Sequence, residues 1–297
     1  MDENTISLPE ILPAYDDGIF KAIFTRPESE PALIDIIKTF TGIEVATVAI
    51  KNSERTVQNA EDKRIRFDIL CTTESGEMID IEMQASAMEG DKSENTHINI
   101  RERSVFYEAM LHSSQPRPKA YTDQCRSIQL MICNYSVFPD DNIIRRFYFT
   151  DEYGGVLSQS MGIIFVELSK LDYKKPVESM SDLEEWAFYL RYSDNPKYRT
   201  VIETLKNEKE VFRMAYETQE MVSQDLSERA YYMSRLKYEL DMQHNETIWT
   251  RQGIQKGIQQ GSKQTTIQIA RNLLSNNAPI DLIMKSTGLS ESELRSL

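Results

Sequence analysis

Apolar and polar residues alternate over residues 64–84, on both sides of the turn Glu74-Ser75-Gly76, with Leu70 as the exception. A period of two that continues across a glycine-containing turn predicts an antiparallel hairpin. A three-residue loop with its glycine in the left-handed conformation is a favoured connection, and it places Asp68 directly opposite Glu82. A two-residue loop would put these carboxylates on opposite faces and expose half of the apolar residues. The pattern therefore selects the first register.

Apolar residues at helical spacing predict helices on both sides of this hairpin. Residues 15–40 carry two apolar stripes separated by prolines, and the second stripe ends before Gly42. Residues 95–113 predict another helix. Residues 181–250 predict a helical, tyrosine-rich region whose aromatic side chains we expect to pack between helices. Short strands are predicted at 45–50, 128–133, 144–149 and 162–167.

These elements divide the chain into three parts. We predict an α/β core with a mixed sheet flanked by helices over residues 1–170, a helical extension over 171–250 and a C-terminal part over 251–297. The C-terminal part begins with evenly spaced glycines, which we expect to break the helix because each costs about 1 kcal/mol against alanine. They are Gly253, Gly257 and Gly261. This connector is interpreted as a flexible link or as a self-association seam.

Three short helices are predicted over residues 264–297, with breaks near Asn277-Ala278-Pro279 and Gly288. The charges of this region nearly balance, whereas a DNA-binding surface needs clustered positive charge. We therefore prefer a small packing or homo-oligomerisation unit over a helix-turn-helix that contacts DNA. The charged residues are Lys263, Arg271, Lys285 and Arg295 against Asp281, Glu291 and Glu293.

The composition excludes several classes of protein. The 297 residues include 34 Lys and Arg against 47 Asp and Glu, and the formal net charge of −13 argues against coating nucleic acid by bulk positive charge. A local basic groove on an acidic body is still compatible with a nuclease. Three cysteines without a CxxC pair argue against a disulfide framework or a zinc site. Without a signal peptide, a membrane span or a phosphate-binding P-loop, the sequence predicts a cytoplasmic protein that uses no ATP.

The predicted hairpin has its own chemistry. Opposed residues of an antiparallel pair have Cβ atoms about 5 Å apart, so Asp68 and Glu82 would repel each other without a cation between them. Such oxygens suit Mg²⁺, which would complete its shell with water and substrate phosphate. The backbone carbonyl of Met83 is a further candidate ligand. The alternative is an amphipathic hairpin whose polar face meets solvent, with Arg64 and Arg66 balancing the acids.

Four short segments follow one another along the first half of the chain: Asp17-Gly18-Ile19-Phe20-Lys21, Arg66-Phe67-Asp68, Ile81-Glu82-Met83-Gln84 and Arg103-Ser104-Val105-Phe106-Tyr107. In this order they resemble the Rpn family of recombination-promoting nucleases, which are also described as transposases of the PD-(D/E)XK nuclease superfamily. The resemblance covers residues 10–170 and extends to the C-terminal tail. It implies a restriction-endonuclease-like fold and a metal-dependent DNA endonuclease linked to recombination, mobile elements or phage defence in bacteria.

The resemblance also implies roles for individual residues. Asp68 and Glu82 would bind Mg²⁺, or Mn²⁺ or Ca²⁺ in its place, and take part in catalysis. Gln84 stands where the superfamily has a lysine and would position the attacking water. Asp17 would be an accessory catalytic acid. Four further residues would contact DNA: Lys21, Arg66, Arg103 and Tyr107.

Several of these residues have simpler interpretations. Asp17 is also a candidate helix cap, as is its neighbour Asp16. Lys21 is a candidate surface charge, and Arg103 with Tyr107 a structural contact on one helix face. The neutral amide of Gln84 supplies no positive charge. Either a nearby arginine or lysine replaces it, or the chain is a catalytically silent scaffold that keeps the nuclease fold to bind DNA or protein.

Overall fold

The computed structural model describes residues 9–51, 68–85, 94–116 and 120–297. The chain divides into two compact units, the sheet unit (Met1–Leu236) and the C-terminal unit (Lys237–Leu297). The division falls inside one helix, α7 (Leu226–Ser275). The division of the chain into a core, a helical extension and a C-terminal part, with boundaries near residues 170 and 250, stays a prediction.

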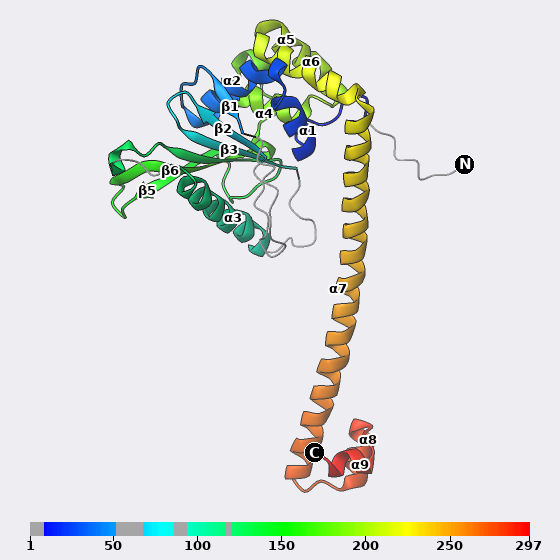
Figure 1. Cartoon of the computed structure of the whole chain (residues 1–297). Helices are drawn as coiled ribbons and strands as arrows, with labels where there is room; N and C mark the ends of the chain where they lie inside the picture. Colours follow the sequence, from blue (N-terminus) through cyan, green and yellow to red (C-terminus); the bar gives the residue numbers. More distant parts are fainter. Residues whose placement is uncertain (1–8, 52–67, 86–93, 117–119) are drawn as a thin grey trace, which may run out of the picture. The chain divides into compact units, whose positions relative to one another are not determined.

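In the described part of the chain, six strands form one mixed sheet in the order β1-β2-β3-β4-β6-β5 (Figure 1). The three central strands β3, β4 and β6 run parallel, and the remaining pairs are antiparallel. The mixed sheet predicted from the sequence is thereby confirmed. The strands are β1 (Val48–Ile50), β2 (Ile69–Thr73), β3 (Met78–Gln84), β4 (Ser127–Cys133), β5 (Ile144–Thr150) and β6 (Val156–Glu167).

Helices cover both faces of this sheet (Figure 1). One face carries the large apolar core, into which the aromatic residues Trp186, Phe188 and Phe212 are packed as expected. The other face lies under α3 (Glu94–Ser113). α2 ends at Gly42, whose φ of 76° gives the left-handed cap that its sequence position predicts. The helices on the core side are α1 (Asp17–Phe24), α2 (Glu30–Thr41), α4 (Asp182–Tyr192), α5 (Arg199–Glu208) and α6 (Glu210–Gln224).

The predicted hairpin register is confirmed in β2 and β3. Ile69 lies opposite Ile81, and the same register continues to Asp68 opposite Glu82. Gly76 has a φ of 89°, so the turn has its glycine in the left-handed conformation. Leu70 breaks the alternation because it packs against Leu111 of α3. Arg64 and the rest of the first arm before Asp68 lie outside the described residues.

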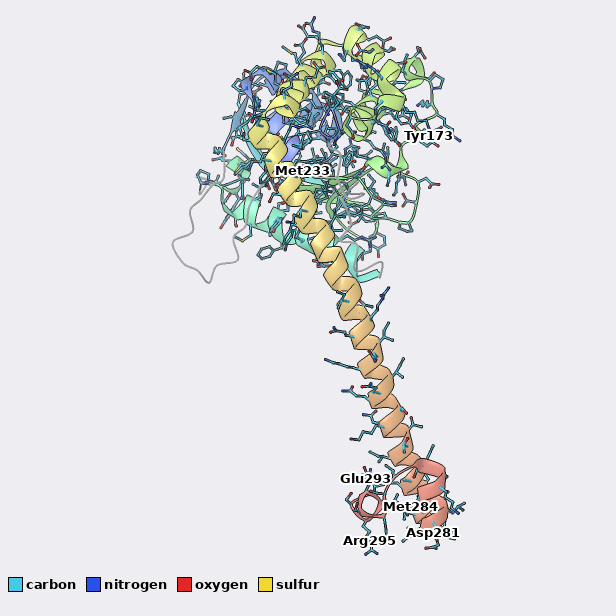
Figure 2. The ribbon with its side chains drawn as sticks, turned by 90° about the vertical axis from the view of Figure 1, so that its right-hand side faces the viewer. Tyr173, Met233, Asp281, Met284, Glu293 and Arg295 are labelled. Carbon is cyan, nitrogen blue, oxygen red and sulfur yellow. The ribbon has the colours of Figure 1, made fainter. Side chains whose placement is uncertain are left out.

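The C-terminal unit folds around the end of α7, where α8 (Ile280–Thr287) and α9 (Glu291–Arg295) close a small apolar core (Figure 2). The predicted breaks near residues 277 and 288 are confirmed, because Asn277 and Gly288 have φ values of 56° and 71°. Among the helices of the described residues, none has both the length and the apolar character needed to span a membrane.

The prediction that the glycines at 253, 257 and 261 break the helix is wrong. α7 continues through all of them. Each glycine costs only about 1 kcal/mol, whereas a proline costs about 3 kcal/mol and removes a backbone donor. No proline occurs in α7, and the neighbouring glutamine and lysine residues favour a helix.

Candidate functional site

The hairpin brings Asp68 and Glu82 together on the sheet face that α3 covers. Glu82 is only 3% exposed. The alternative in which this polar face simply meets solvent is therefore wrong. The physical reason is topological: β3 and β4 are parallel, so the chain between them must cross over the sheet, and it does so through α3.

Both carboxylates accept hydrogen bonds from nearby donors. Glu82 Oε2 accepts from Arg103 Nη2 at 3.2 Å and from Gln84 Nε2 at 3.4 Å. Asp68 Oδ2 accepts from the backbone N–H of Met83 at 3.3 Å. The other oxygen of Glu82, Oε1, is buried and has no hydrogen-bond partner among the described residues. A buried carboxylate oxygen without a donor is costly, so this site is suited to an additional positive group.

Burial decides the protonation of the pair. It raises the pKa of Asp68 to about 6, although the Met83 N–H and the positive charges of Lys21 and Arg103 oppose this shift. Burial also raises the pKa of Glu82 to about 7, against the attraction of Arg103 and with the repulsion of Asp68. Near neutral pH the carboxylates are thus close to titration, and a cation would favour their ionised form.

A third acid on the same face escaped the sequence interpretation. Asp80 is 0% exposed, and neither of its carboxylate oxygens has a well-aligned hydrogen bond within the described ranges, although the Gln129 side chain lies near enough to lower its pKa. Burial and the negative charge of Glu82 raise its pKa well above the usual range. The signal was present in the sequence, because Asp80 precedes Glu82 by two positions and a period of two puts both on one face.

The donor set fits a hard divalent cation. Among the described residues, no three His, Cys, Asp or Glu side chains are already assembled around one point. Mg²⁺ is commonly held by only one or two carboxylates, with water and substrate phosphate filling the other positions. Asp68 and Glu82, with a free buried oxygen on Glu82, match that pattern. The backbone N–H of Met83 donates to Asp68, which places the backbone of Met83 beside the carboxylates. The carbonyl of Met83 stays a candidate ligand.

The start of α1 clarifies the two aspartates there. Asp16 is the helix cap, with its carboxylate accepting from the N–H of Ile19 at 3.1 Å. Of the two aspartates that the sequence offers as the cap, Asp16 is therefore confirmed, and Asp17 is not the cap. Asp17 accepts from the N–H of Gly18 and forms an ion pair with Arg235 of α7. Its negative charge is thus already compensated within the sheet unit.

The residues predicted to contact DNA differ in how closely they approach the carboxylates. Lys21 and Arg103 act on the carboxylates, since both lower the pKa of Asp68 and Arg103 also forms the ion pair with Glu82. Tyr107 lies one helical turn beyond Arg103, whose guanidinium carbon is 5.8 Å from the centre of the tyrosine ring. Burial, and to a lesser extent the negative charge of Glu82, raises the pKa of Tyr107. Arg66 lies outside the described residues.

Comparison with known families agrees with this site. Residues 14–246 match the model of the PD-(D/E)XK nuclease family transposase. Residues 263–297 match the model of the Rpn/YhgA-like nuclease family, C-terminal HTH domain. No curated protein and no solved structure gives a significant match. The second match favours the helix-turn-helix interpretation of the C-terminal unit over the packing unit that its charge balance suggested.

Proposed function

Because this chain belongs to the PD-(D/E)XK nuclease family transposases, in the Rpn group, we propose that it is a DNA endonuclease whose divalent cation is held by Asp68 and Glu82. One observation carries the proposal. Half-buried Asp68 lies opposite buried Glu82, and one oxygen of Glu82 is left without a donor among the described residues. A role in recombination, mobile elements or phage defence follows from the same family.

The residues around the pair have complementary tasks. A bound Mg²⁺, Mn²⁺ or Ca²⁺ would polarise the scissile phosphate and lower the pKa of a water molecule. The ionised carboxylates of Asp68 and Glu82 would bind the cation, and the backbone carbonyl of Met83 would be a further ligand. The Gln84 amide, which now donates to Glu82, orients the attacking water. Asp17, compensated by Arg235, serves as an accessory acid only when that ion pair opens.

Arg103 supplies the positive charge that Gln84 lacks. Its guanidinium is fixed on Glu82 and stacks toward Tyr107, so it stands beside the carboxylate that binds the cation. In this position it would stabilise negative charge that develops on the phosphate. Lys21 on the Asp68 side and Arg66 would contact the DNA backbone.

The C-terminal unit would hold the DNA. Its helices α8 and α9 are joined by a turn with the left-handed Gly288, and the match to the C-terminal HTH family model supports a helix-turn-helix here. Residues 263–297 contain only four Lys and Arg, and Arg295 is paired with Glu291 inside α9, so this part would make few phosphate contacts. Homo-oligomerisation through this part of the chain stays a prediction.

A plasmid assay tests the proposal directly. The full chain should nick supercoiled DNA with Mg²⁺ or Mn²⁺ and fail to do so in EDTA. Glu82→Gln should abolish nicking, whereas Glu74→Gln, which changes an exposed carboxylate in the turn of the same hairpin, should leave it intact. Nicking that survives EDTA or the Glu82→Gln substitution contradicts the proposed site.

The second candidate is the catalytically silent scaffold. It is favoured by the absence of a lysine at Gln84 and by the engagement of Arg103 with Glu82 in the present structure. It predicts DNA binding without nicking under any divalent cation. The same plasmid assay, read together with a gel-shift measurement, separates the two candidates.

A further inference from the structure

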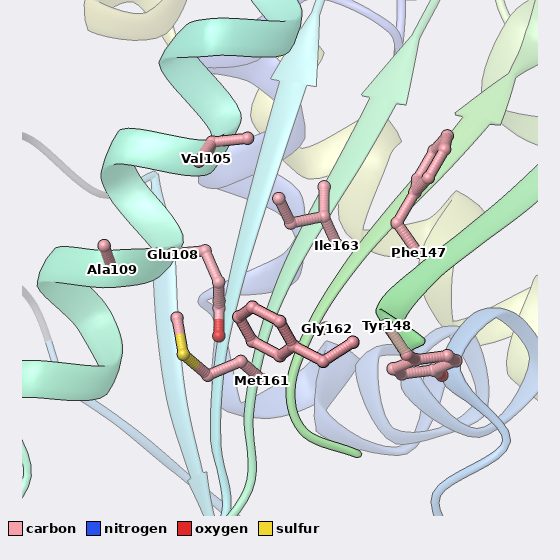
Figure 3. Close-up of a pocket in the computed structure, with 9 residues that line it drawn as sticks. Val105, Glu108, Ala109, Phe147, Tyr148, Met161, Gly162 and Ile163 are labelled. Carbon is pink, nitrogen blue, oxygen red and sulfur yellow. The ribbon is translucent and has the colours of Figure 1, made fainter. Parts of the chain in front are cut away.

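A pocket lies beyond the carboxylate site, between α3 and the strands β5 and β6 (Figure 3). Its volume is about 290 Å³, and its lining is almost entirely apolar. Three consecutive aromatic residues of β5 contribute to it: Phe147, Tyr148 and Phe149. Pockets of this kind bind flat apolar ligands when a polar group inside them fixes the orientation.

Glu108 is the charged residue among those that line the pocket. It is only 2% exposed, and Figure 3 shows its carboxylate directed toward Met161 and Gly162. Oε1 accepts a hydrogen bond from Ser127 Oγ at 2.6 Å. Oε2 is buried and forms no well-aligned hydrogen bond within the described part of the chain, although the backbone N–H groups of Gly162 and Gln129 lie near this carboxylate and lower its pKa. The pocket therefore combines aromatic surfaces with a carboxylate that has room for a further donor.

The shape of the pocket depends on close packing between β5 and β6. The register of these strands shifts between Phe147 and Phe149, so Tyr148 sits at a bulge. Its ring lies over Gly162, where an added Cβ would be 2.7 Å from Tyr148 Cε1. A glycine at this position is thus required for the present placement of the tyrosine ring.

We propose that this pocket binds an unpaired DNA base that carries an exocyclic amino group, namely cytosine, adenine or guanine. The inference rests on the proposed function, because a nuclease is expected to meet such bases in its substrate. Bases stack on aromatic side chains, and a glutamate accepts a hydrogen bond from an amino group of a base. Thymine presents its only ring N–H between two carbonyl oxygens, which would repel the carboxylate. The pocket should therefore discriminate against thymine.

The test uses the full chain in EDTA, so that binding is measured without cleavage. The probes are short single strands of abasic residues that contain one dC, one dT or no base, followed by fluorescence anisotropy. We expect the dC strand to bind about tenfold more tightly than the strand with no base, because stacking of one base contributes about that much. It should also bind more tightly than the dT strand, because only cytosine offers its amino group to the Glu108 carboxylate. Equal affinity for all three strands would overturn the inference. Nicking of supercoiled DNA by the same protein once Mg²⁺ is supplied would leave the proposed function standing.

Two half-exposed phenylalanines provide a matched pair of variants. Phe149 lines the pocket and is 49% exposed, whereas Phe106 lies outside it on α3 and is 56% exposed. Phe149→Ala should remove the preference for the dC strand, and Phe106→Ala should retain it. Glu108→Gln should bring the dC and dT strands to similar affinity. Equal losses in Phe149→Ala and Phe106→Ala would show that the pocket does not bind the base.

Free deoxycytidine distinguishes a DNA base from a soluble nucleoside. In equilibrium dialysis it should bind weakly and compete with the dC strand. A different outcome is that deoxycytidine binds, that Phe149→Ala abolishes this binding, and that no strand binds. The pocket would then take free nucleosides, and the assignment to DNA would be wrong. If neither binds, the pocket inference fails whatever the plasmid assay shows.

Discussion

The two faces of β3 differ although their residues alternate along one strand. Ile79, Ile81 and Met83 point into the large core under α1 and α2 and are essentially fully buried. Asp80 and Glu82 are equally buried under α3, yet oxygens of both lack well-aligned hydrogen bonds among the described residues. Burial thus stabilises the fold on one face and stores unfavourable electrostatics on the other. Adjacent residues of equal exposure should therefore respond to substitution in opposite ways.

The sharpest test of the polar face is whether its two carboxylates act as one unit. Asp68→Asn and Glu82→Gln should each lower the nicking rate about a thousandfold or more, since cation chemistry contributes several kcal/mol. The double variant should lose little beyond either single variant, because residues that act together are strongly non-additive. Rates of plasmid nicking measure this. Losses that multiply in the double variant would show that the carboxylates act independently.

The apolar face is tested one residue away. Ile81→Ala should lower the free energy of unfolding by about 2–5 kcal/mol, because it leaves a cavity in a fully buried position. Glu82→Gln, measured in EDTA at pH 8, should leave the stability unchanged or raise it. Urea unfolding of both variants makes the comparison. A Glu82→Gln protein as unstable as Ile81→Ala would mean that the Arg103 ion pair outweighs the burial cost.

Stability should fall as the pH rises in the absence of divalent cations. Burial raises the pKa of Asp68 from 3.8 to about 6, and those of Glu82 and Glu108 from 4.5 to about 7. The folded state therefore holds these protons more tightly than the unfolded state. This stabilisation is complete below about pH 4 and is lost as the pH passes through 6 and 7.

Urea unfolding in EDTA at pH 5 and pH 8 measures this dependence. The free energy of unfolding should be lower at pH 8 by at least about 1.4 kcal/mol, the equivalent of one pKa unit. Mg²⁺ should reduce the difference by favouring the ionised carboxylates. Stability that is equal or greater at pH 8 in EDTA would contradict the assigned direction of these pKa shifts.

The smallest expected effect concerns Gln84 at the edge of the site. Gln84→Ala should slow nicking about tenfold, less than the roughly 10²- to 10⁴-fold of a group that itself transfers a proton, because Gln84 only orients the water. Gln84→Lys should keep or raise the rate, because it restores the positive charge that Arg103 otherwise supplies. Single-turnover nicking at saturating Mg²⁺ provides the measurement. A Gln84→Lys protein as inactive as Glu82→Gln would mean that the amide has a role other than orienting water.

Local patterns predicted the parts of the fold that depend on few residues. The hairpin register follows from a period of two and from Gly76, and the end of α2 follows from Gly42. The prediction for α7 failed because glycine spacing was weighed without the cooperativity of a long helix, in which each added residue gains a hydrogen bond.

The candidate site was only partly accessible from the sequence. The opposition of Asp68 and Glu82 is local and was found. The pairing of Arg103 with Glu82 depends on how α3 crosses the sheet, which residue spacing does not reveal. Glu108 was missed for the same reason, since its burial is a property of the covered face. Asp80 shares the face of Glu82 by the period of two, and only its burial depends on α3.

The placement of both candidate ligands on one hairpin has a consequence for the order of folding. Hairpins close in about 1–10 μs, before parallel strands that need long connections can pair. Asp68 and Glu82 would thus approach each other before α3, which follows later in the chain and carries Arg103, has docked on the sheet. During that interval their mutual repulsion opposes closure of the hairpin. A divalent cation would then act as a nucleation aid, and the speed of folding would depend on the ions present while the chain is still being made.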